Sequence, residues 1–158
     1  MKRIGMMALA LAMGLSLLAG CGGKNSGETA YTTDQVQKMV DAGAFSEQLE
    51  SLDGDTAYAL YKLGDYELSR EDLTDCAVLR SAGATCEEAA VLIFADSDKA
   101  EQAEKALKDY VSGQISANRD YRPNEIPKLE GALVEQKDNS VLLVVANDMD
   151  AAKGVVGD

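Results

Sequence analysis

The chain has 158 residues, of which 15 are basic and 27 acidic, and its formal net charge is −12 at pH 7. So acidic a chain lacks the cations that would neutralise phosphates, which argues against a nucleic-acid partner. It contains no histidine and no tryptophan, so histidine-based general bases and imidazole metal ligands are excluded and proposals for base or sugar stacking are weakened. We expect no catalytic residue, no metal site and no cofactor.

The N-terminal segment is the first feature along the chain. Lys2 and Arg3 precede an uncharged run of sixteen residues, Ile4 to Ala19. A positive head, an apolar stretch and small residues before a cleavage point are typical of a bacterial export signal. A transmembrane anchor would need about 20 apolar residues, and a buried helix would not explain the polar segment that follows. We therefore expect residues 1–20 to be a signal peptide.

The signal ends in the tetrapeptide "LAGC", residues 18–21. This sequence resembles the lipobox of bacterial lipoproteins. The resemblance implies that a lipid is attached to the sulfur of Cys21 and that the chain is cleaved between Gly20 and Cys21. Two acyl chains on one residue would meet the requirement of two signals for stable membrane anchoring. We expect a protein that is lipid-anchored to the cell membrane, on its extracytoplasmic face.

The mature chain would have 138 residues, which suits a single domain. The signal removes two basic residues and no acidic one, so the mature net charge is about −14. Residues 21–33 are rich in Gly, Ser and Thr, which is typical of a flexible tether. Residues 34–158 are expected to form one α+β domain. It carries no basic patch for anionic lipids, so the tether alone would hold it at the membrane.

Helical spacing dominates the first third of the domain. Apolar residues predict a first helix that begins at Asp34 and ends near Leu52, with Gly43 as an unfavourable interruption. A short second helix is expected over residues 56–63. The tetrapeptide "SRED" at 69–72 has the form of a capping box, which predicts a single helical turn there.

The pattern then changes to strands. The segments 76–81 ("CAVLRS") and 89–96 ("AAVLIFAD") flank small residues and predict a hairpin. The clearest helix covers Ser97 to Asn118, with apolar residues along one side. Either Asp96 or Ser97 can cap its start. The helix should end before Pro123, because a residue before proline avoids helical angles.

A second hairpin is predicted from segments 131–136 ("GALVEQ") and 141–147 ("VLLVVAN"), and a short helix or a frayed end follows. The element order predicts an α+β fold: a four-stranded, mainly antiparallel sheet of two hairpins that flank one long helix, with an additional N-terminal helix. The runs 91–94 and 141–145 are continuously apolar, so both sheet faces should be covered. We expect the N-terminal helix to cover the second face; a second subunit is the alternative, and the oligomeric state stays open.

Cys76 and Cys86 are the remaining cysteines. A disulfide is permitted outside the reducing cytosol. If the hairpin turns around residues 83–84, Cys76 lies opposite Val91, roughly 16 Å from Cys86 at the usual strand rise. A disulfide needs α-carbons within about 7 Å. We expect two free thiols that are buried or half-buried.

Several acidic pairs and one basic spot are the remaining candidate sites. The pairs are Asp53/Asp55, Glu71/Asp72, Glu87/Glu88, Asp96/Asp98 and Asp148/Asp150. None lies in a calcium-loop pattern, and several are expected at helix starts, where the dipole favours acids. Arg119 and Arg122 form the one small basic spot and are a candidate anion site. Tyr121, between them, is expected to pack beside the turn.

The order of "SAGATCEEAAVLIF", an amphipathic helix, "YRP" and "ALVEQKDNSVLLVVANDMD" resembles a bacterial lipoprotein domain known as domain of unknown function 4358. The resemblance covers residues 71–150, about half of the chain. It implies a membrane-tethered extracytoplasmic domain from a Gram-positive type of bacterium, and it carries over no catalytic residue.

From the residues we expect a non-enzymatic binding or protein-interaction module of unknown ligand, with the membrane and an envelope protein as partners. The alternative is a carboxylate-dependent hydrolase that acts on cell-envelope material. A deep cleft holding two acids with raised pKa values would favour the hydrolase.

Overall fold

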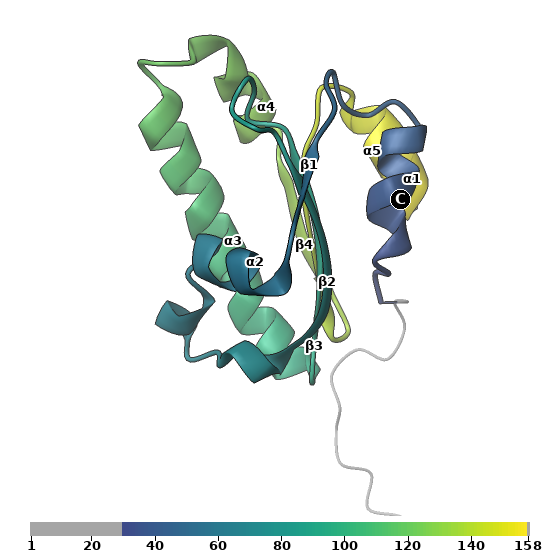
Figure 1. Cartoon of the computed structure of the whole chain (residues 1–158), viewed down its shortest axis with the longest axis vertical. Coiled ribbons are helices and arrows are strands. Elements are labelled where there is room, and N and C mark those ends of the chain that lie inside the picture. Colours follow the sequence, from purple (N-terminus) through teal and green to yellow (C-terminus); the bar gives the residue numbers. More distant parts are fainter. Residues whose placement is uncertain (1–29, 158) are drawn as a thin grey trace, which may run out of the picture.

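The computed structural model describes residues 30–157, in which one five-stranded antiparallel sheet lies between two layers of helices (Figure 1). The strands are β1 (Glu50–Leu52), β2 (Leu73–Arg80), β3 (Glu88–Phe94), β4 (Leu133–Lys137) and β5 (Ser140–Val145). The α-helices are α1 (Asp34–Asp41), α2 (Gly54–Leu60), α3 (Ser97–Asn118), α4 (Ile126–Glu130) and α5 (Met149–Val156). Three short 3-10 helices are η1 (Leu63–Tyr66), η2 (Arg70–Asp72) and η3 (Pro123–Glu125). The α+β class is confirmed.

The sheet has the strand order β1-β2-β3-β5-β4, which places the two most apolar strands, β3 and β5, side by side. Val91 pairs with Leu142, and Leu92 pairs with Val141. Because successive residues of a strand point to opposite faces, the first pair enters one hydrophobic core and the second pair enters the other. This division explains why neither strand alternates between apolar and polar residues.

One face of the sheet is covered by α2, α3 and α4 (Figure 1). α3 begins at its N-cap Asp96, whose side chain accepts a hydrogen bond from Lys99 N at 2.9 Å. Its buried residues are mostly small, which brings the helix close to the sheet, and Leu107 fills the centre of the contact. The long helix predicted over Ser97 to Asn118 is therefore confirmed with the same bounds.

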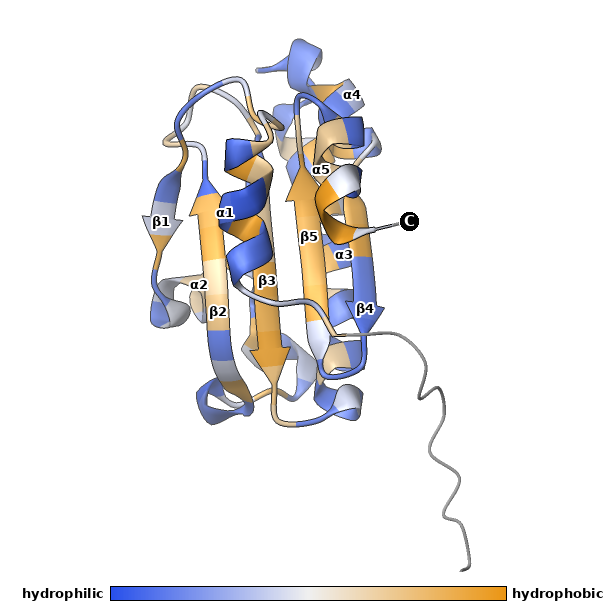
Figure 2. Ribbon diagram, turned by 90° about the vertical axis from the view of Figure 1, so that its right-hand side faces the viewer, coloured by the Kyte–Doolittle hydropathy of each residue, from blue (hydrophilic) through white to orange (hydrophobic). Residues whose placement is uncertain are grey.

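The other face of the sheet is covered by α1 and α5, which lie in front of β3 and β5 in Figure 2. Val36 and Met39 of α1 and Ala152 of α5 are buried against the sheet. The expectation that this chain covers its own second face is thus confirmed, with α5 adding to the cover. Tyr31, which the sequence placed in the tether, is also buried here, and its N–H donates to Ser140 Oγ at 2.7 Å.

The sheet has five strands, so the prediction of four was wrong. The additional strand, β1, is three residues long and pairs with β2 from Glu50↔Arg80 to Leu52↔Val78. It occupies a segment that was predicted to continue the first helix. That helix ends at Asp41, because Gly43 takes a positive φ of 78°, a conformation that glycine adopts without steric cost and that terminates helices.

The segment between α3 and β4 also differs from expectation, since η3 and α4 form over residues 123–130 where no helix was predicted. Pro123 and Pro127 stand near the starts of these two short helices, where a missing N–H costs nothing. Within residues 30–157, no helix combines the length and the hydropathy that crossing a bilayer requires.

Candidate functional site

A cavity of about 610 Å³ opens between α3 and the segment formed by α2 and η1. We call it the tyrosine cavity, because three of its lining residues are Tyr61, Tyr66 and Tyr110. Leu60, Ala106 and Gly113 add apolar surface, Gln114 adds an amide, and Lys62, Asp65 and Asp109 bring charges to the exposed rim. A mainly apolar wall with a few polar groups is typical of small-molecule sites.

The local sequence explains how α2 and η1 reach this position. Asp53 caps α2 by accepting a hydrogen bond from Thr56 N at 2.8 Å, so the helix begins immediately after β1. The helix ends at Leu60, and the chain turns sharply after the C-cap residue Tyr61. Lys62 and Glu67 take left-handed conformations, with φ of 52° and 60°, on either side of η1. The resulting loop turns back toward α3, and Tyr66 Oη donates to Asp109 across the rim.

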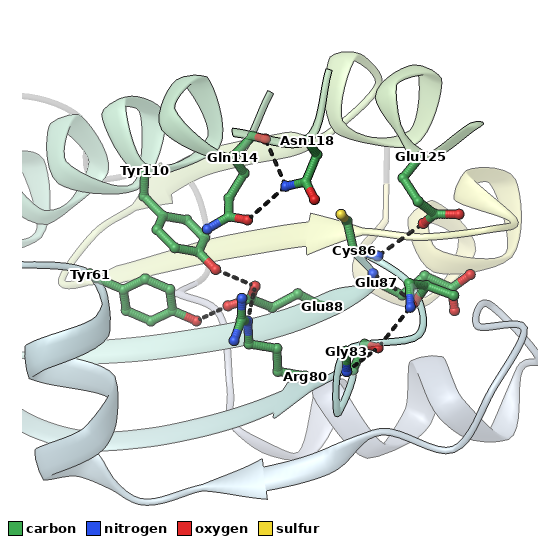
Figure 3. Close-up of polar contacts among 12 residues, drawn as sticks. Tyr61, Arg80, Gly83, Cys86, Glu87, Glu88, Tyr110, Gln114, Asn118 and Glu125 are labelled. Atoms are coloured by element: carbon green, nitrogen blue, oxygen red, sulfur yellow. Dashed lines mark hydrogen bonds and ion pairs between the residues drawn. The ribbon is translucent and has the colours of Figure 1, made fainter. Parts of the chain in front are cut away.

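Tyr61 and Tyr110 meet at the base of the cavity over a buried carboxylate (Figure 3). Glu88, which is 2% exposed, accepts hydrogen bonds from Tyr61 Oη at 2.5 Å and Tyr110 Oη at 2.8 Å. Arg80 Nε lies 3.3 Å from the same carboxylate. Burial raises the pKa of Glu88, although the two hydroxyl donors and Arg80 act in the opposite direction.

A second, smaller cavity of about 220 Å³ lies on the other side of Tyr110 and Gln114, which line both cavities. We call it the arginine cavity, because Arg80 and Arg122 line it together with Glu88. The loop between β2 and β3 forms much of the remaining wall, and Leu129 of α4 and Val145 of β5 complete it. Two positively charged side chains therefore line one cavity, although the net charge of the chain is negative.

Glu87, the neighbour of Glu88, is held by a different set of partners. Its side chain is fully buried and accepts hydrogen bonds from Ser46 N at 2.8 Å, Ser46 Oγ at 2.5 Å and Lys128 Nζ at 2.7 Å. Partial burial lowers the pKa of Lys128, but its bonds to Glu87 and Glu125 outweigh that effect and the net pKa is raised. This network joins α4 and the segment after α1 to the start of β3.

The two residues of the predicted basic spot, Arg119 and Arg122, lie in different environments, and only Arg122 lines the arginine cavity. Arg122 is half-buried in the arginine cavity and donates from Nη1 to Thr85 O at 3.1 Å. Arg119 is exposed and does not line that cavity. Tyr121 is 88% exposed, so the expectation that it packs beside the turn was wrong. The loop conformation, which the spacing did not reveal, places Arg122 at the same cavity as Arg80.

Four members of the acidic pairs stabilise helix starts. Asp53, Asp96 and Asp148 cap helices, and Asp72 completes the predicted capping box with Ser69. Bonds from backbone or hydroxyl donors lower the pKa values of Asp53 and Asp72. Within the described residues no group of three or more Cys, Asp or Glu side chains is arranged to hold a metal ion.

Cys76 and Cys86 carry free, half-buried thiols, as predicted. The register differs by one residue from the expected one, because Cys76 pairs with Leu92 and Cys86 lies before β3. Burial raises the pKa of both thiols. Gly20 and Cys21, the predicted cleavage and lipid-attachment residues, lie outside the described residues.

Sequence reasoning missed Tyr61, Tyr110, Glu88 and Arg80 as a cluster. They come from four elements, so their spacing along the chain carries no motif. One signal was present: Glu87 and Glu88 directly precede an apolar strand, and acids at the start of a buried strand need partners.

Comparison with known proteins places the chain in a family. A search of curated proteins and a search of solved structures each found no match. A family model described as "Domain of unknown function (DUF4358)" matches residues 45–146. The match runs from the segment before β1 to the end of β5 and includes the residues that line both cavities. It covers more than half of the 158 residues, so the chain belongs to the DUF4358 family.

Proposed function

We propose that this protein is a lipid-anchored, extracytoplasmic binding module, without enzymatic activity, that holds a small and partly apolar ligand in the tyrosine cavity. The observation that carries the proposal is the cavity itself, with its volume of about 610 Å³ and its wall of three tyrosines. Each of these tyrosine hydroxyls donates to a carboxylate within the domain: Tyr61 and Tyr110 to Glu88, and Tyr66 to Asp109. Such internal bonds favour a site that is already formed before ligand arrives.

The chemistry of the lining narrows the ligand class. Tyrosine rings and the aliphatic surface of Leu60 and Ala106 suit a flat or apolar body. The amide of Gln114 and the charged groups of Lys62 and Asp109 can orient polar substituents at the open side. The ligand we infer is therefore a small organic molecule with an apolar part and hydrogen-bonding groups.

The anchor in this proposal rests on the pattern of residues 18–21. A lipid on Cys21 and the short segment between Cys21 and the buried Tyr31 would keep the domain close to the membrane surface. At the membrane surface, the protein would bind its ligand in the tyrosine cavity and have an envelope protein as its partner. The acidic domain itself has little attraction for anionic lipid head groups, which is why the proposal assigns membrane attachment to the lipid.

The alternative function, a carboxylate-dependent hydrolase, has less support from the arrangement of the acidic residues. Its chemistry asks for two carboxyl groups at one cleft, at least one with a raised pKa. Burial raises the pKa of Glu88, but both of its oxygens are occupied by Tyr61, Tyr110 and Arg80. The two acids of the tyrosine cavity, Asp65 and Asp109, stand at its exposed rim.

The ligand proposal is tested by filling the cavity. Gly113 lies in α3, and a Cβ added there would meet no atom within 4 Å, so Gly113→Leu projects a side chain into open space without a clash. Gly154 in α5 has the same freedom on the opposite side of the sheet, and Gly154→Leu is the matched control.

The measurement is the melting temperature of the full chain against a panel of small metabolites. We expect at least one compound to raise the melting temperature of the wild type and of Gly154→Leu, but not of Gly113→Leu. A compound that stabilises all three chains equally binds elsewhere, and a broad panel without any stabilising compound would count against the proposal.

The anchor is tested separately, by intact-mass spectrometry and membrane fractionation of the native protein. We expect the wild type and Cys76→Ser to lose residues 1–20, to carry acyl chains and to sediment with membranes. Cys21→Ser should remain an unacylated precursor. The same acyl modification on Cys21→Ser as on the wild type, with masses that differ only by the exchange of sulfur for oxygen, would refute lipid attachment at Cys21.

A further inference from the structure

Two arginines from distant parts of the chain face the arginine cavity. Arg80 is the last residue of β2, and Arg122 directly precedes η3. Both line a hollow of about 220 Å³. Two like charges at one small hollow repel each other, and the arrangement is unexpected in a chain with 27 acidic and 15 basic residues. The pair therefore points to a negative group that the cavity receives.

Arg122 has donors to spare. Among residues 30–157, no carboxylate forms an ion pair with it. Its Nη1 donates to Thr85 O, and the guanidinium lies against the thiol of Cys86. A guanidinium carries five N–H groups, so these contacts leave several of them for a ligand.

Glu88 is the one acid among the residues that line this cavity. Its carboxylate already has hydrogen-bond donors and a positively charged partner. Its carboxylate accepts from Tyr61 Oη, from Tyr110 Oη and from Arg80 Nε. Arg80 thus uses Nε for this contact and also approaches Tyr110. Among residues 30–157 its guanidinium forms no ion pair other than that with Glu88, and Arg80 lines the cavity.

The rim of the cavity is fixed by its own hydrogen bonds. Ser81 Oγ accepts from Gly83 N at 3.1 Å and from Thr85 N at 3.0 Å, and it donates to Glu47 at 2.6 Å. Gly83 has a φ of 124°, which favours glycine, and the position leaves the mouth without a side chain. The loop is therefore held in shape by its internal hydrogen bonds, with no side chain at position 83.

We propose that the arginine cavity is an oxyanion site, in which the carboxylate or phosphate group of a small ligand is held between Arg80 and Arg122. Planar guanidinium groups match both kinds of oxyanion through paired N–H donors. The inference goes beyond the proposed function and does not depend on it, because the tyrosine cavity lies on the other side of Tyr110 and Gln114.

The test titrates the full chain with sodium phosphate and with sodium succinate, against sodium chloride at equal ionic strength. Binding is followed by NMR at the Gly83 amide and the arginine Nε–H groups. Arg122→Gln removes one arm of the site. Arg119→Gln makes the same change of charge three residues away, at an exposed position, and is the matched control.

We expect phosphate or succinate to shift these signals where chloride does not. Arg122→Gln should weaken that binding about tenfold or more, as loss of a charge-assisted hydrogen bond does, and Arg119→Gln should change it less than about twofold. Tighter binding of phosphate assigns the site to phosphate groups, and tighter binding of succinate to carboxylates; both results support the proposal.

Two results would overturn the oxyanion proposal. The first is that neither phosphate nor succinate shifts the signals more than chloride does. The second is that Arg122→Gln and Arg119→Gln weaken binding equally, which would indicate a general attraction of anions to positive charge. If Arg122→Gln lowers the melting temperature markedly, Arg122→Lys replaces it. Lysine keeps the charge and loses the fork, so binding should again weaken. Gly113→Leu, which adds a side chain at the tyrosine cavity, should leave phosphate and succinate binding unchanged, so the two proposals fail independently.

Discussion

Tyr110 stands edge-on to Tyr61, with ring centroids 5.1 Å apart and an interplanar angle of 85°. Both hydroxyls donate to the same buried carboxylate, that of Glu88. Since Tyr61 is the C-cap of α2 and Tyr110 lies in α3, the contact ties two helices to the first residue of β3. Tyr110, which lines both cavities, thus belongs to a triangle of two hydrogen bonds and one ring contact, and the stability of this triangle decides whether the proposed sites keep their shape.

Removing one hydroxyl from this triangle should destabilise the fold. Tyr61→Phe keeps the ring and its packing but leaves Glu88 Oε1 without its donor in a buried position. A hydrogen bond to a charged group contributes about 1.5–3 kcal/mol, and we expect the free energy of unfolding to fall by about that amount. Urea denaturation measures it.

Tyr121→Phe is the matched control, because Tyr121 is 88% exposed. The same chemical change there should leave the free energy of unfolding unchanged within about 0.5 kcal/mol. Equal effects of the two variants would show that the Tyr61 hydroxyl contributes nothing specific.

The stability of the protein should depend on pH through Glu88. Burial raises the pKa of Glu88 in the folded state above its ordinary value of 4.5. The folded chain therefore holds this proton more tightly than the unfolded chain, so acidification from neutral pH to about 4.5 should stabilise the fold and a rising pH should remove that gain. We expect Glu88→Gln to flatten this part of a melting-temperature profile.

Three hydrogen-bonded carboxylates outside the core give the opposite slope at lower pH. Hydrogen bonds lower the pKa values of Asp53 and Asp72 below 3.8 and that of Glu47 below 4.5. Their contributions are lost as the pH falls through the folded-state pKa values. This loss of stability at low pH should appear both in the wild type and in Glu88→Gln. The relief of repulsion between acidic side chains on acidification should also be common to both. Parallel profiles throughout would mean that Glu88 titrates normally.

Periodicity predicted the elements that are long. The 22 residues of α3 repeat their apolar face often enough to be read from the sequence, and β3 and β5 are uninterrupted apolar runs. β1 is a three-residue strand, "ESL", too short for any period to appear. Its existence depends on pairing with β2, a tertiary contact that local sequence does not encode.

The candidate site was less predictable than the fold for the same reason. Arg80 and Glu88 meet because of the register of the β2–β3 hairpin, in which they are paired residues. The spot at Arg119 and Arg122 was identified from charge alone, and the turn after α3 then sends only Arg122 toward Arg80. The charge of a residue in the sequence identifies it as a candidate site residue. Which other residues it meets depends on strand register and loop conformation.

The buried pair of Glu87 and Lys128 offers a further test. Lys128→Met removes the cation that lies 2.7 Å from a fully buried carboxylate and leaves that charge without its ion pair. Breaking a buried pair in this way costs about 3–5 kcal/mol. We expect a loss near the lower end of this range, because Ser46 continues to donate two hydrogen bonds to Glu87.

Two companion variants identify the cause. Lys105→Met removes an exposed partner of Glu101 on α3, where a loss below about 0.5 kcal/mol is expected. The double variant Glu87→Gln/Lys128→Met removes the buried charge together with its partner and should recover part of the stability. If the double variant is as unstable as Lys128→Met, lost packing of the lysine stem, and not the uncompensated charge, explains the effect.

The last prediction concerns α5, which helps to cover the second face of the sheet. Asp148 caps this helix by accepting a hydrogen bond from Ala151 N at 3.0 Å, while its own N–H donates to Ala44 O at 2.9 Å and joins α5 to the end of α1. Asp148→Ala should lower the free energy of unfolding by about 1 kcal/mol, the usual cost of a lost cap. Hydrogen exchange should show faster exchange at the first amides of α5.

Asn is an equally good cap, so Asp148→Asn should retain most of the stability, whereas Asp150→Ala, at an exposed first-turn position, should cost only a few tenths of a kcal/mol. Because Val91, Leu142 and Val144 are buried under α1 and α5, loosening of the cap should also increase binding of a hydrophobic dye. Similar losses in Asp148→Ala and Asp148→Asn would attribute the effect to the charge, and the cap would then not be what holds α5 on the sheet.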